Sequence, residues 1–170
     1  LPDIVLSGIN RGPNMGVNIL WSGTTNAATQ ATLHGIRALA FSHVCFTNES
    51  EGFVYAAQFA RRLAEMADQF HFPIRTILNV NFPNLNEVTP KKVVVTRMSK
   101  TNWFGGYSVV EEIEDGVTSY RVQSDYQAED GPGDDSYEIR QDNISITPLV
   151  SEFTDEGALA GLSFLNDMQI

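Results

Sequence analysis

The chain has 170 residues and carries 11 Lys and Arg against 21 Asp and Glu, a formal net charge of −10. Such a surface repels a nucleic-acid backbone, so we expect no nucleic-acid polymer as partner, although a small phosphorylated ligand held locally is not excluded. No stretch approaches 18 apolar residues, and the single cysteine, Cys45, fits a reducing compartment, so we expect a cytoplasmic protein with no membrane segment.

The chain begins with the order strand, loop, helix, strand. "DIVL" at 3–6 is an apolar run typical of a buried strand, and a glycine-rich loop follows at 7–16. Ser, Thr and Asn open an alanine-rich segment at 22–35, and a glycine closes it, which are the start and stop signals of a helix. "IRALAFS" at 36–42 is a second apolar strand. This order predicts a parallel sheet.

The next segments continue an α/β pattern. Apolar residues recur at helical spacing over 51–70, beginning with Phe53 and Ala57, and predict a helix that covers one face of the sheet. "TILNVNFP" at 76–83 alternates apolar residues with two Asn and ends at a proline, as a strand does. "KKVVVTRM" at 91–98 predicts a further strand.

The second half changes character. Two β-prone runs over 107–122 flank Asp115-Gly116, a dipeptide that favours a tight hairpin turn. An acidic, turn-rich stretch follows at 124–139. "NISITPL" at 143–149 predicts a strand and "TDEGALAGLSFLND" at 154–167 a capped terminal helix.

These patterns divide the chain into three parts. Residues 1–100 are expected to form an α/β core, 101–150 a β-hairpin arm with the acidic turn region, and 151–170 a C-terminal helix. Leu1 already lies at the start of the first strand, so we also expect that an N-terminal part of the fold is missing.

The loop "SGINRGPNMG" is the first candidate site. Its glycines are Gly8, Gly12 and Gly16, and the asparagines in and after it are Asn10, Asn14 and Asn18. Glycine allows positive φ and a close approach of backbone amides to a ligand, and an Asn oxygen is a hard, neutral ligand suited to Mg²⁺, Mn²⁺ or Ca²⁺. The loop leaves the carboxyl end of a strand, where open α/β sheets bind ligands. A structural turn stabilised by Asn remains the alternative.

The start of the predicted helix is the second candidate. Ser22, Gly23, Thr24 and Thr25 lie where free amides and the positive end of the helix dipole attract an anion. Ordinary N-capping is the alternative, but capping needs only one of these residues. The surplus favours phosphate binding.

The remaining ionisable residues indicate no site. His34, His43 and His71 lack the spacing of metal ligands. Asp134 and Asp135 could in principle share a metal, but before "SYEI" they are more typical of a helix N-cap and its first-turn charge.

The stretch "PDIVLSGINRGPNMGVNILWSGTTNAATQATLHGIRALAFS", residues 2–42, resembles the SurE family of stationary-phase survival proteins, which are metal-dependent 5′-nucleotidases and phosphatases. "LNVNFP", "TR" and "SITPL" follow in the family's order, so the likeness covers roughly its C-terminal two-thirds. The resemblance implies a Rossmann-like three-layer α/β core with a parallel-type sheet, plus a β-hairpin arm used in assembly into a homodimer or homotetramer.

The resemblance also implies an activity and a site. It implies hydrolysis of nucleoside 5′-monophosphates with Mg²⁺ or Mn²⁺. Asn10 would be a metal ligand, and Ser22, Gly23 and Thr24 would contact the substrate phosphate, with Asn14 beside the same pocket. The three glycines of the loop would support this arrangement.

One departure from the family pattern matters. The family's metal site also uses two adjacent aspartates and a serine that precede the matching block, so the catalytic acidic pair is expected upstream of Leu1 and the chain alone is expected to be inactive. A divalent ion held by one neutral Asn would bind weakly. The alternative function is therefore a non-catalytic phosphate- or nucleotide-binding module, or an oligomerisation module.

Overall fold

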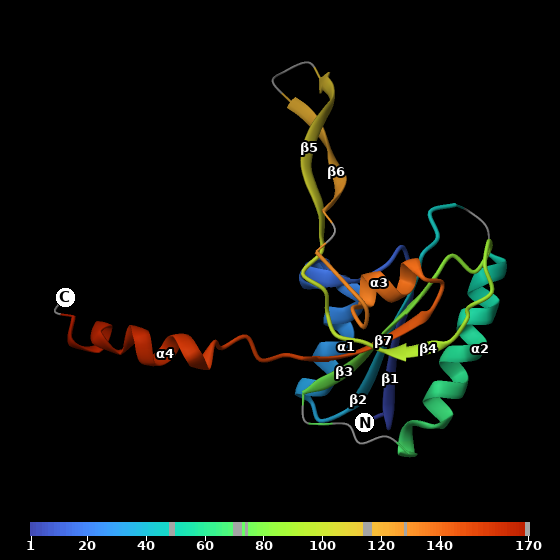
Figure 1. The fold of residues 1–170 in the computed structure, drawn as a ribbon, viewed down its shortest axis with the longest axis horizontal. Coiled ribbons are helices and arrows are strands. Elements are labelled where there is room, and N and C mark those ends of the chain that lie inside the picture. Colours follow the sequence, from blue (N-terminus) through green and yellow to red (C-terminus); the bar gives the residue numbers. More distant parts are fainter. Residues whose placement is uncertain (48–49, 70–72, 74, 114–116, 128, 169–170) are drawn as a thin grey trace.

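A five-stranded sheet forms the centre of the computed structural model (Figure 1). The structure describes residues 1–47, 50–69, 73, 75–113, 117–127 and 129–168. The strands follow the order β1 (Ile4–Arg11), β2 (Arg37–His43), β3 (Thr76–Phe82), β7 (Ile144–Val150) and β4 (Val93–Val95). β1, β2 and β3 are parallel, while β7 runs antiparallel to β3 and parallel to β4. The sheet is thus mixed: β1, β2 and β3 are parallel as predicted, and β7 and β4 run in the opposite direction.

Helices cover both faces of this sheet, which confirms the three-layer α/β architecture. α1 (Gly23–Leu33) lies on one face, against a cluster of small residues and Ile77. α2 (Glu51–Glu65) lies on the other face. The core cluster under α2 is larger and comprises Leu39, Phe41, Ala56, Ala60, Leu63, Val80, Phe82 and Ile144. Alanines on both helices allow the backbones to approach the sheet closely.

The helix predicted over 51–70 is shorter in the structure, and at its start it buries a different face from the one predicted. α2 ends at Glu65, and a 3₁₀ turn (Ala67–Gln69) follows it. Ala56, not Ala57, is buried, and it follows Gly52 by one turn, where a Cβ would lie 2.5 Å from Cε1 of His43. Ala57 faces a groove instead.

The first strand is longer than "DIVL". β1 continues to Arg11, so Gly8 and Asn10 lie within the strand and not in a loop. Pairing with β2 becomes irregular between Ser7 and Asn10 and then resumes, with Asn10 opposite Ser42. Gly8 makes this possible, because its φ is +122° and a Cβ there would lie 2.4 Å from the carbonyl oxygen of Phe41. The Gly8–Ile9 peptide bond is cis.

A two-stranded arm leaves the core (Figure 1). β5 (Asn102–Ile113) and β6 (Val117–Gln127) pair antiparallel, which confirms the predicted hairpin. The predicted turn at Asp115-Gly116 lies outside the described residues. The region expected to belong to the arm, 101–150, divides, because α3 (Asp135–Arg140) contacts β7 and β7 lies inside the core sheet.

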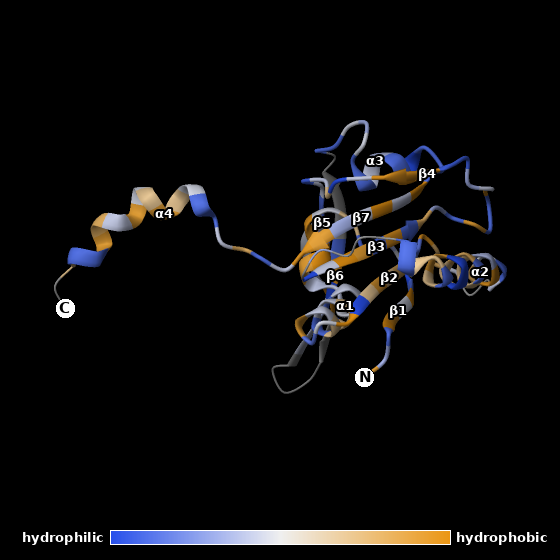
Figure 2. Ribbon diagram, turned by 90° about the horizontal axis from the view of Figure 1, so that it is seen from below, coloured by the Kyte–Doolittle hydropathy of each residue, from blue (hydrophilic) through white to orange (hydrophobic). Residues whose placement is uncertain are grey.

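The C-terminal segment extends away from the core (Figures 1 and 2). α4 (Glu156–Leu162) is capped by Asp155, whose carboxylate accepts from the amide of Ala158, and a 3₁₀ segment (Ser163–Asp167) continues it. The predicted terminal helix is therefore confirmed, with a 3₁₀ second half. No helix among the described residues combines the length and apolar character needed to cross a membrane.

Candidate functional site

The candidate residues gather at the carboxyl edge of β1, β2 and β3. Because β1 and β2 are parallel, α1 must begin at the edge where β1 ends. Asn10 near the end of β1 and Ser22 to Thr24 at the start of α1 therefore lie at the same edge of the sheet. A short 3₁₀ segment, η1 (Gly16–Trp21), connects them. This is the edge at which open α/β sheets bind ligands.

The side chain of Asn10 is oriented by its own loop. Its Nδ2 donates to the carbonyl oxygen of Gly12 at 2.9 Å, and the residue is half-buried. This bond fixes the carboxamide plane and directs Oδ1, the atom that can ligate a cation, away from that carbonyl. Asn10 can therefore offer one preoriented neutral oxygen.

The start of α1 carries both the helix cap and hydrogen-bond donors that can bind an anion. Ser22 is the N-cap, and its Oγ accepts from the amide of Thr25 at 3.1 Å. The hydroxyl of Thr25 is buried and donates to the carbonyl of Ile19 at 2.9 Å. Gly23 is exposed and Thr24 half-buried, and helix geometry leaves their first-turn amides without partners within the helix. The Thr25 hydroxyl thus serves the local fold, whereas the Ser22 hydroxyl only accepts in the cap and can still donate its hydrogen to an anion, as can Gly23 and Thr24.

Asn14 takes part in a buried hydrogen-bond network. Its Nδ2 donates to Oγ of Ser42 at 2.7 Å, and its backbone amide donates to Oδ1 of Asn81 at 2.9 Å. Its carbonyl accepts from Nδ2 of both Asn79 and Asn81. These four residues are buried, and they fasten the loop onto the ends of β2 and β3. The predicted contact of Asn14 with phosphate stays a prediction, while its structural role is direct.

Sequence reasoning did not assign Ser42, Asn79 and Asn81 to the site. The signal was present in "LNVNFP", where two asparagines alternate with buried apolar residues of a central strand. Buried amides need partners, so such a pattern predicts that another backbone segment lies against that face of the strand.

The supporting glycines adopt positive φ, as the loop pattern predicted. Gly12 has φ +97° and donates its amide to the carbonyl of His43 at 2.8 Å. Gly16 has φ +55°, and a Cβ there would lie 2.3 Å from the carbonyl oxygen of Thr101. Gly16 therefore lies too close to the residue before β5 for any side chain to fit at this position.

His43 is a neutral, buried histidine beneath this loop. Its Nε2 accepts from the amide of Leu85 at 2.9 Å, so in the neutral ring the proton lies on Nδ1, which is buried without a partner among the described residues. The ring packs edge-on against Phe53, with centroids 4.9 Å apart. Burial lowers the pKa of His43. Of the other two histidines, His34 caps the end of α1, and His71 lies outside the described residues.

Asp134 and Asp135 start α3, as predicted. Asp134 is the N-cap residue, but its carboxylate accepts from the amide of Gly131 and pairs with Arg97 at 2.6 Å, with no capping bond to its own helix. Asp135 is fully buried and accepts hydrogen bonds from three backbone amides, those of Gly16, Ser99 and the adjacent Ser136.

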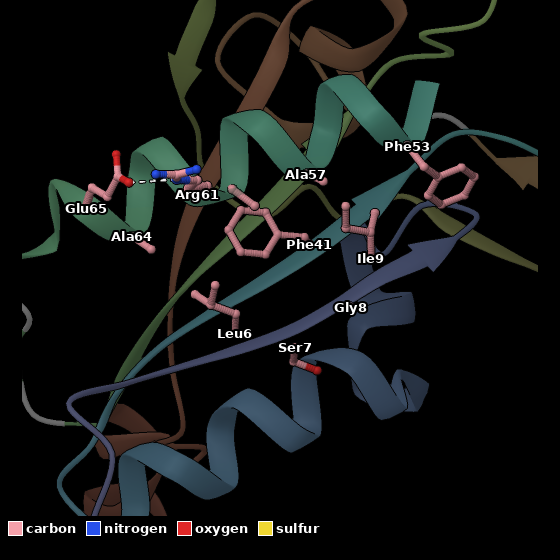
Figure 3. Close-up of a pocket in the computed structure, with 11 residues that line it drawn as sticks. Leu6, Ser7, Gly8, Ile9, Phe41, Phe53, Ala57, Arg61, Ala64 and Glu65 are labelled. Carbon is pink, nitrogen blue, oxygen red and sulfur yellow. Dashed lines mark hydrogen bonds and ion pairs between the residues drawn. The ribbon is translucent and has the colours of Figure 1, made fainter. Parts of the chain in front are cut away.

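A groove of about 570 Å³ lies between β1 and α2, on the face of the sheet that α2 covers (Figure 3). Leu6 and Phe41 line its floor from the sheet and Ala57 its wall from α2. Arg61 and Glu65 form an ion pair at its rim, with Nε and Oε1 2.8 Å apart. Among the described residues β1 pairs only with β2, so the groove borders an open strand edge that another segment can cover.

Comparison with known families identifies the chain. A family model described as "Survival protein SurE" matches residues 1–105, more than half of the chain. The chain belongs to the SurE family. The segment that the SurE model matches contains every candidate residue from Gly8 to Thr24.

Several SurE proteins align over most of the chain. One named 5′-nucleotidase SurE, from Myxococcus xanthus (strain DK1622), is 42% identical over 165 residues, which cover 95% of this chain and 61% of that protein. A protein of the same name from Geotalea daltonii (strain DSM 22248 / JCM 15807 / FRC-32) is 37% identical over 163 residues, which cover 64% of it. The crystal structure of SurE from Aquifex aeolicus matches 98% of this chain and 66% of that chain, with 29% identity and a TM-score of 0.74. The chain thus spans about three fifths of the length of the SurE relatives it matches.

The candidate metal ligands of this SurE chain are few. Over residues 1–47, 50–69, 73, 75–113, 117–127 and 129–168, no group of three or more His, Cys, Asp or Glu could hold a metal ion. Asn10 supplies one neutral oxygen, whereas Mg²⁺ in proteins is bound through one or two carboxylates. The described residues therefore do not complete a metal site by themselves.

Proposed function

We propose that the chain is part of a metal-dependent phosphomonoesterase that hydrolyses nucleoside 5′-monophosphates to nucleoside and phosphate. The observation that carries this proposal is the match to proteins named 5′-nucleotidase SurE over 95% of the chain, including the whole loop and helix start. The geometry supports it, because one preoriented Asn oxygen and one helix N-terminus lie at the ligand-binding edge of the sheet.

In this proposal the chain binds and orients the phosphoryl group. The amides of Gly23 and Thr24 and the hydroxyls of Ser22 and Thr24 donate to its oxygens, and the helix dipole stabilises its charge. Asn10 supplies one oxygen to Mg²⁺ or Mn²⁺. The carboxylate ligands and the acid–base group come from residues outside the described ones, as the resemblance implies.

The test is phosphate release from a nucleoside 5′-monophosphate by the protein expressed from its complete reading frame, with Mg²⁺ or Mn²⁺ present. Asn10→Ala and Thr24→Ala should each lower kcat/KM by roughly 100-fold, the scale at which a lost ligand or charge-stabilising donor acts. Thr29→Ala, in the body of the same helix, is the matched control and should stay within about twofold of the wild type. Absence of phosphate release with every nucleotide and both metals would refute the proposal.

A second candidate is a non-catalytic phosphate- or nucleotide-binding module. The lack of a group of three ligating side chains among the described residues favours it. Calorimetric binding of a nucleoside monophosphate that is weakened by Thr24→Ala, without phosphate release by the complete protein, would decide for this candidate.

We propose that the protein forms a homodimer or homotetramer. Both elements that leave the core carry exposed apolar side chains, unusual for a monomer. On α4 and its flanks these are Phe153, Leu159, Leu162, Phe164, Leu165 and Met168. On the hairpin they are Tyr107, Val109, Val110, Tyr120 and Val122. A second copy of the chain would cover them.

A further inference from the structure

Three segments far apart in the sequence meet at the carboxylate of Asp135. The amide of Gly16 donates to Oδ2 at 3.0 Å, and the amide of Ser99 donates to Oδ1 at 3.0 Å. The amide of Ser136, next in the chain, donates to Oδ1 at 2.7 Å. Asp135 is 0% exposed.

Such a carboxylate is held firmly. A charged group in the interior is tolerated only when hydrogen bonds compensate its loss of water, and three amide donors do this here. Bonds from backbone amides to an ionised carboxylate are also stronger than bonds between neutral groups. Removing the acceptor would leave the amides of Gly16 and Ser99 buried without partners.

The segment held by this carboxylate leads directly to the helix start. Gly16 opens η1, which ends at Trp21, the residue before Ser22. On its other side the segment touches the root of the hairpin. The amide of Val17 donates to the carbonyl of Thr101 at 3.2 Å, and the close approach of Gly16 to that carbonyl allows no Cβ.

We infer that Asp135 is a positioning residue for the phosphate-binding helix start. The inference rests on the proposed function, in which Ser22, Gly23 and Thr24 contact the phosphoryl group. Asp135 does not touch this group but fixes the distance between η1 and the loop before β5. The loop at the root of the hairpin and the segment that leads to the helix start therefore share one anchor.

The chain offers a matched control for this role. Glu138 is also a buried carboxylate, 8% exposed, and lies in the same helix α3. Its Oε1 accepts from the amide of Gly133 at 2.9 Å and its Oε2 from Nδ2 of Asn143 at 2.6 Å, so its hydrogen bonds hold the two ends of α3 and do not reach the segment from Gly16 to Trp21. Its loss should destabilise α3 without releasing η1.

The experiment compares Asp135→Asn with Glu138→Gln in the complete protein. Amide hydrogen exchange is measured by mass spectrometry on peptides covering residues 14–24, and kcat and KM are measured with a nucleoside 5′-monophosphate. Both variants should unfold at lower urea. Only Asp135→Asn should speed exchange in this segment, by about tenfold or more, and raise KM by a similar factor, because an Asn side chain offers one acceptor oxygen where two are used.

The two readouts separate positioning from stability. A purely structural role lowers the folded fraction, and with it the apparent kcat, but leaves KM unchanged. Equal exchange and equal KM in the two variants would overturn the inference. If the wild type releases no phosphate, the proposed function fails, and the exchange comparison alone decides whether Asp135 holds the helix start. If Asp135→Asn does not fold, Asp135→Glu is measured against Glu138→Asp, since each of these changes keeps the charge and displaces it by one methylene.

Discussion

Asn14 and Asn81 bind each other twice: the backbone amide of Asn14 donates to Oδ1 of Asn81 at 2.9 Å, and Nδ2 of Asn81 donates to the carbonyl of Asn14 at 3.0 Å. The carboxamide of Asn81 thus acts as one more peptide group and pairs with the loop as a neighbouring strand would. This relationship joins the loop of the candidate site to the centre of the sheet.

Asn81→Ala should therefore destabilise the protein by about 1 to 3 kcal/mol, because the amide of Asn14 is left buried without an acceptor. Asn81→Asp should be worse, since a carboxylate oxygen would then face the carbonyl of Asn14. Urea unfolding followed by circular dichroism measures both. Asn84→Ala, a half-buried control with only a local side-chain bond, should change the unfolding free energy by less than about 1 kcal/mol. Equal effects at positions 81 and 84 would show that the pairing contributes little.

Much of the fold could be predicted from local patterns. Residue spacing and turn residues that act within a few positions predict four of its parts: the βαβ unit, helix α2, the hairpin and the capped terminal helix. The end of β1 could not be predicted in this way. Glycine and asparagine after Leu6 are typical of a turn, yet Gly8 bends the strand and pairing resumes at Asn10.

The part of the candidate site that is contiguous in sequence could be predicted from its residue types. The glycines, Asn10 and the helix start are contiguous in sequence, and their residue types indicate anion and cation chemistry. The partners of Asp135 were not predictable, because Gly16 lies 119 positions and Ser99 36 positions away. Before "SYEI" an aspartate predicts only a first-turn charge, and only the tertiary fold shows which amides reach it.

Gly8→Ala should destabilise the protein strongly. The substitution places a Cβ 2.4 Å from the carbonyl oxygen of Phe41 and requires a side chain at φ +122°, so backbone strain and overlap add to roughly 2 to 5 kcal/mol. Gly161→Ala is the control, because a Cβ there meets nothing within 4 Å and the residue lies in a helix, where alanine is favoured. Thermal unfolding of both variants tests the comparison. A Gly8→Ala protein as stable as the wild type would mean that β1 can straighten without cost.

Acid should weaken the fold through His43. Burial lowers its folded-state pKa below the ordinary value of 6.5, so the unfolded chain binds the proton more readily. The contribution of neutral His43 is fully present above pH 6.5 and is lost as the pH falls from 6.5 toward the folded-state pKa. Protonation of Nε2 would also break its bond with the amide of Leu85.

The difference in urea midpoint between wild type and His43→Gln should therefore shrink or reverse between pH 7.5 and pH 5, because glutamine does not titrate. His34→Gln, an exposed change at the end of α1, is the control and should leave the pH dependence of the wild type intact. A wild-type profile parallel to that of His43→Gln over this range would contradict the prediction.

Removal of the C-terminal arm should lower the oligomeric state. Every described residue of α4 is exposed, and Leu159 and Leu162 are large and apolar. Because an isolated helix of this length is marginal in water, α4 gains stability only by burying this face. Truncation after Ser151, measured by size-exclusion chromatography with light scattering, should yield a smaller species than the wild type. Leu162→Asp tests the same face in the complete chain, with Glu156→Gln at the polar start of α4 as the control. If truncation and Leu162→Asp both leave the wild-type mass unchanged, α4 takes no part in assembly, and deletion of residues 107–123 then asks whether the hairpin alone supports it.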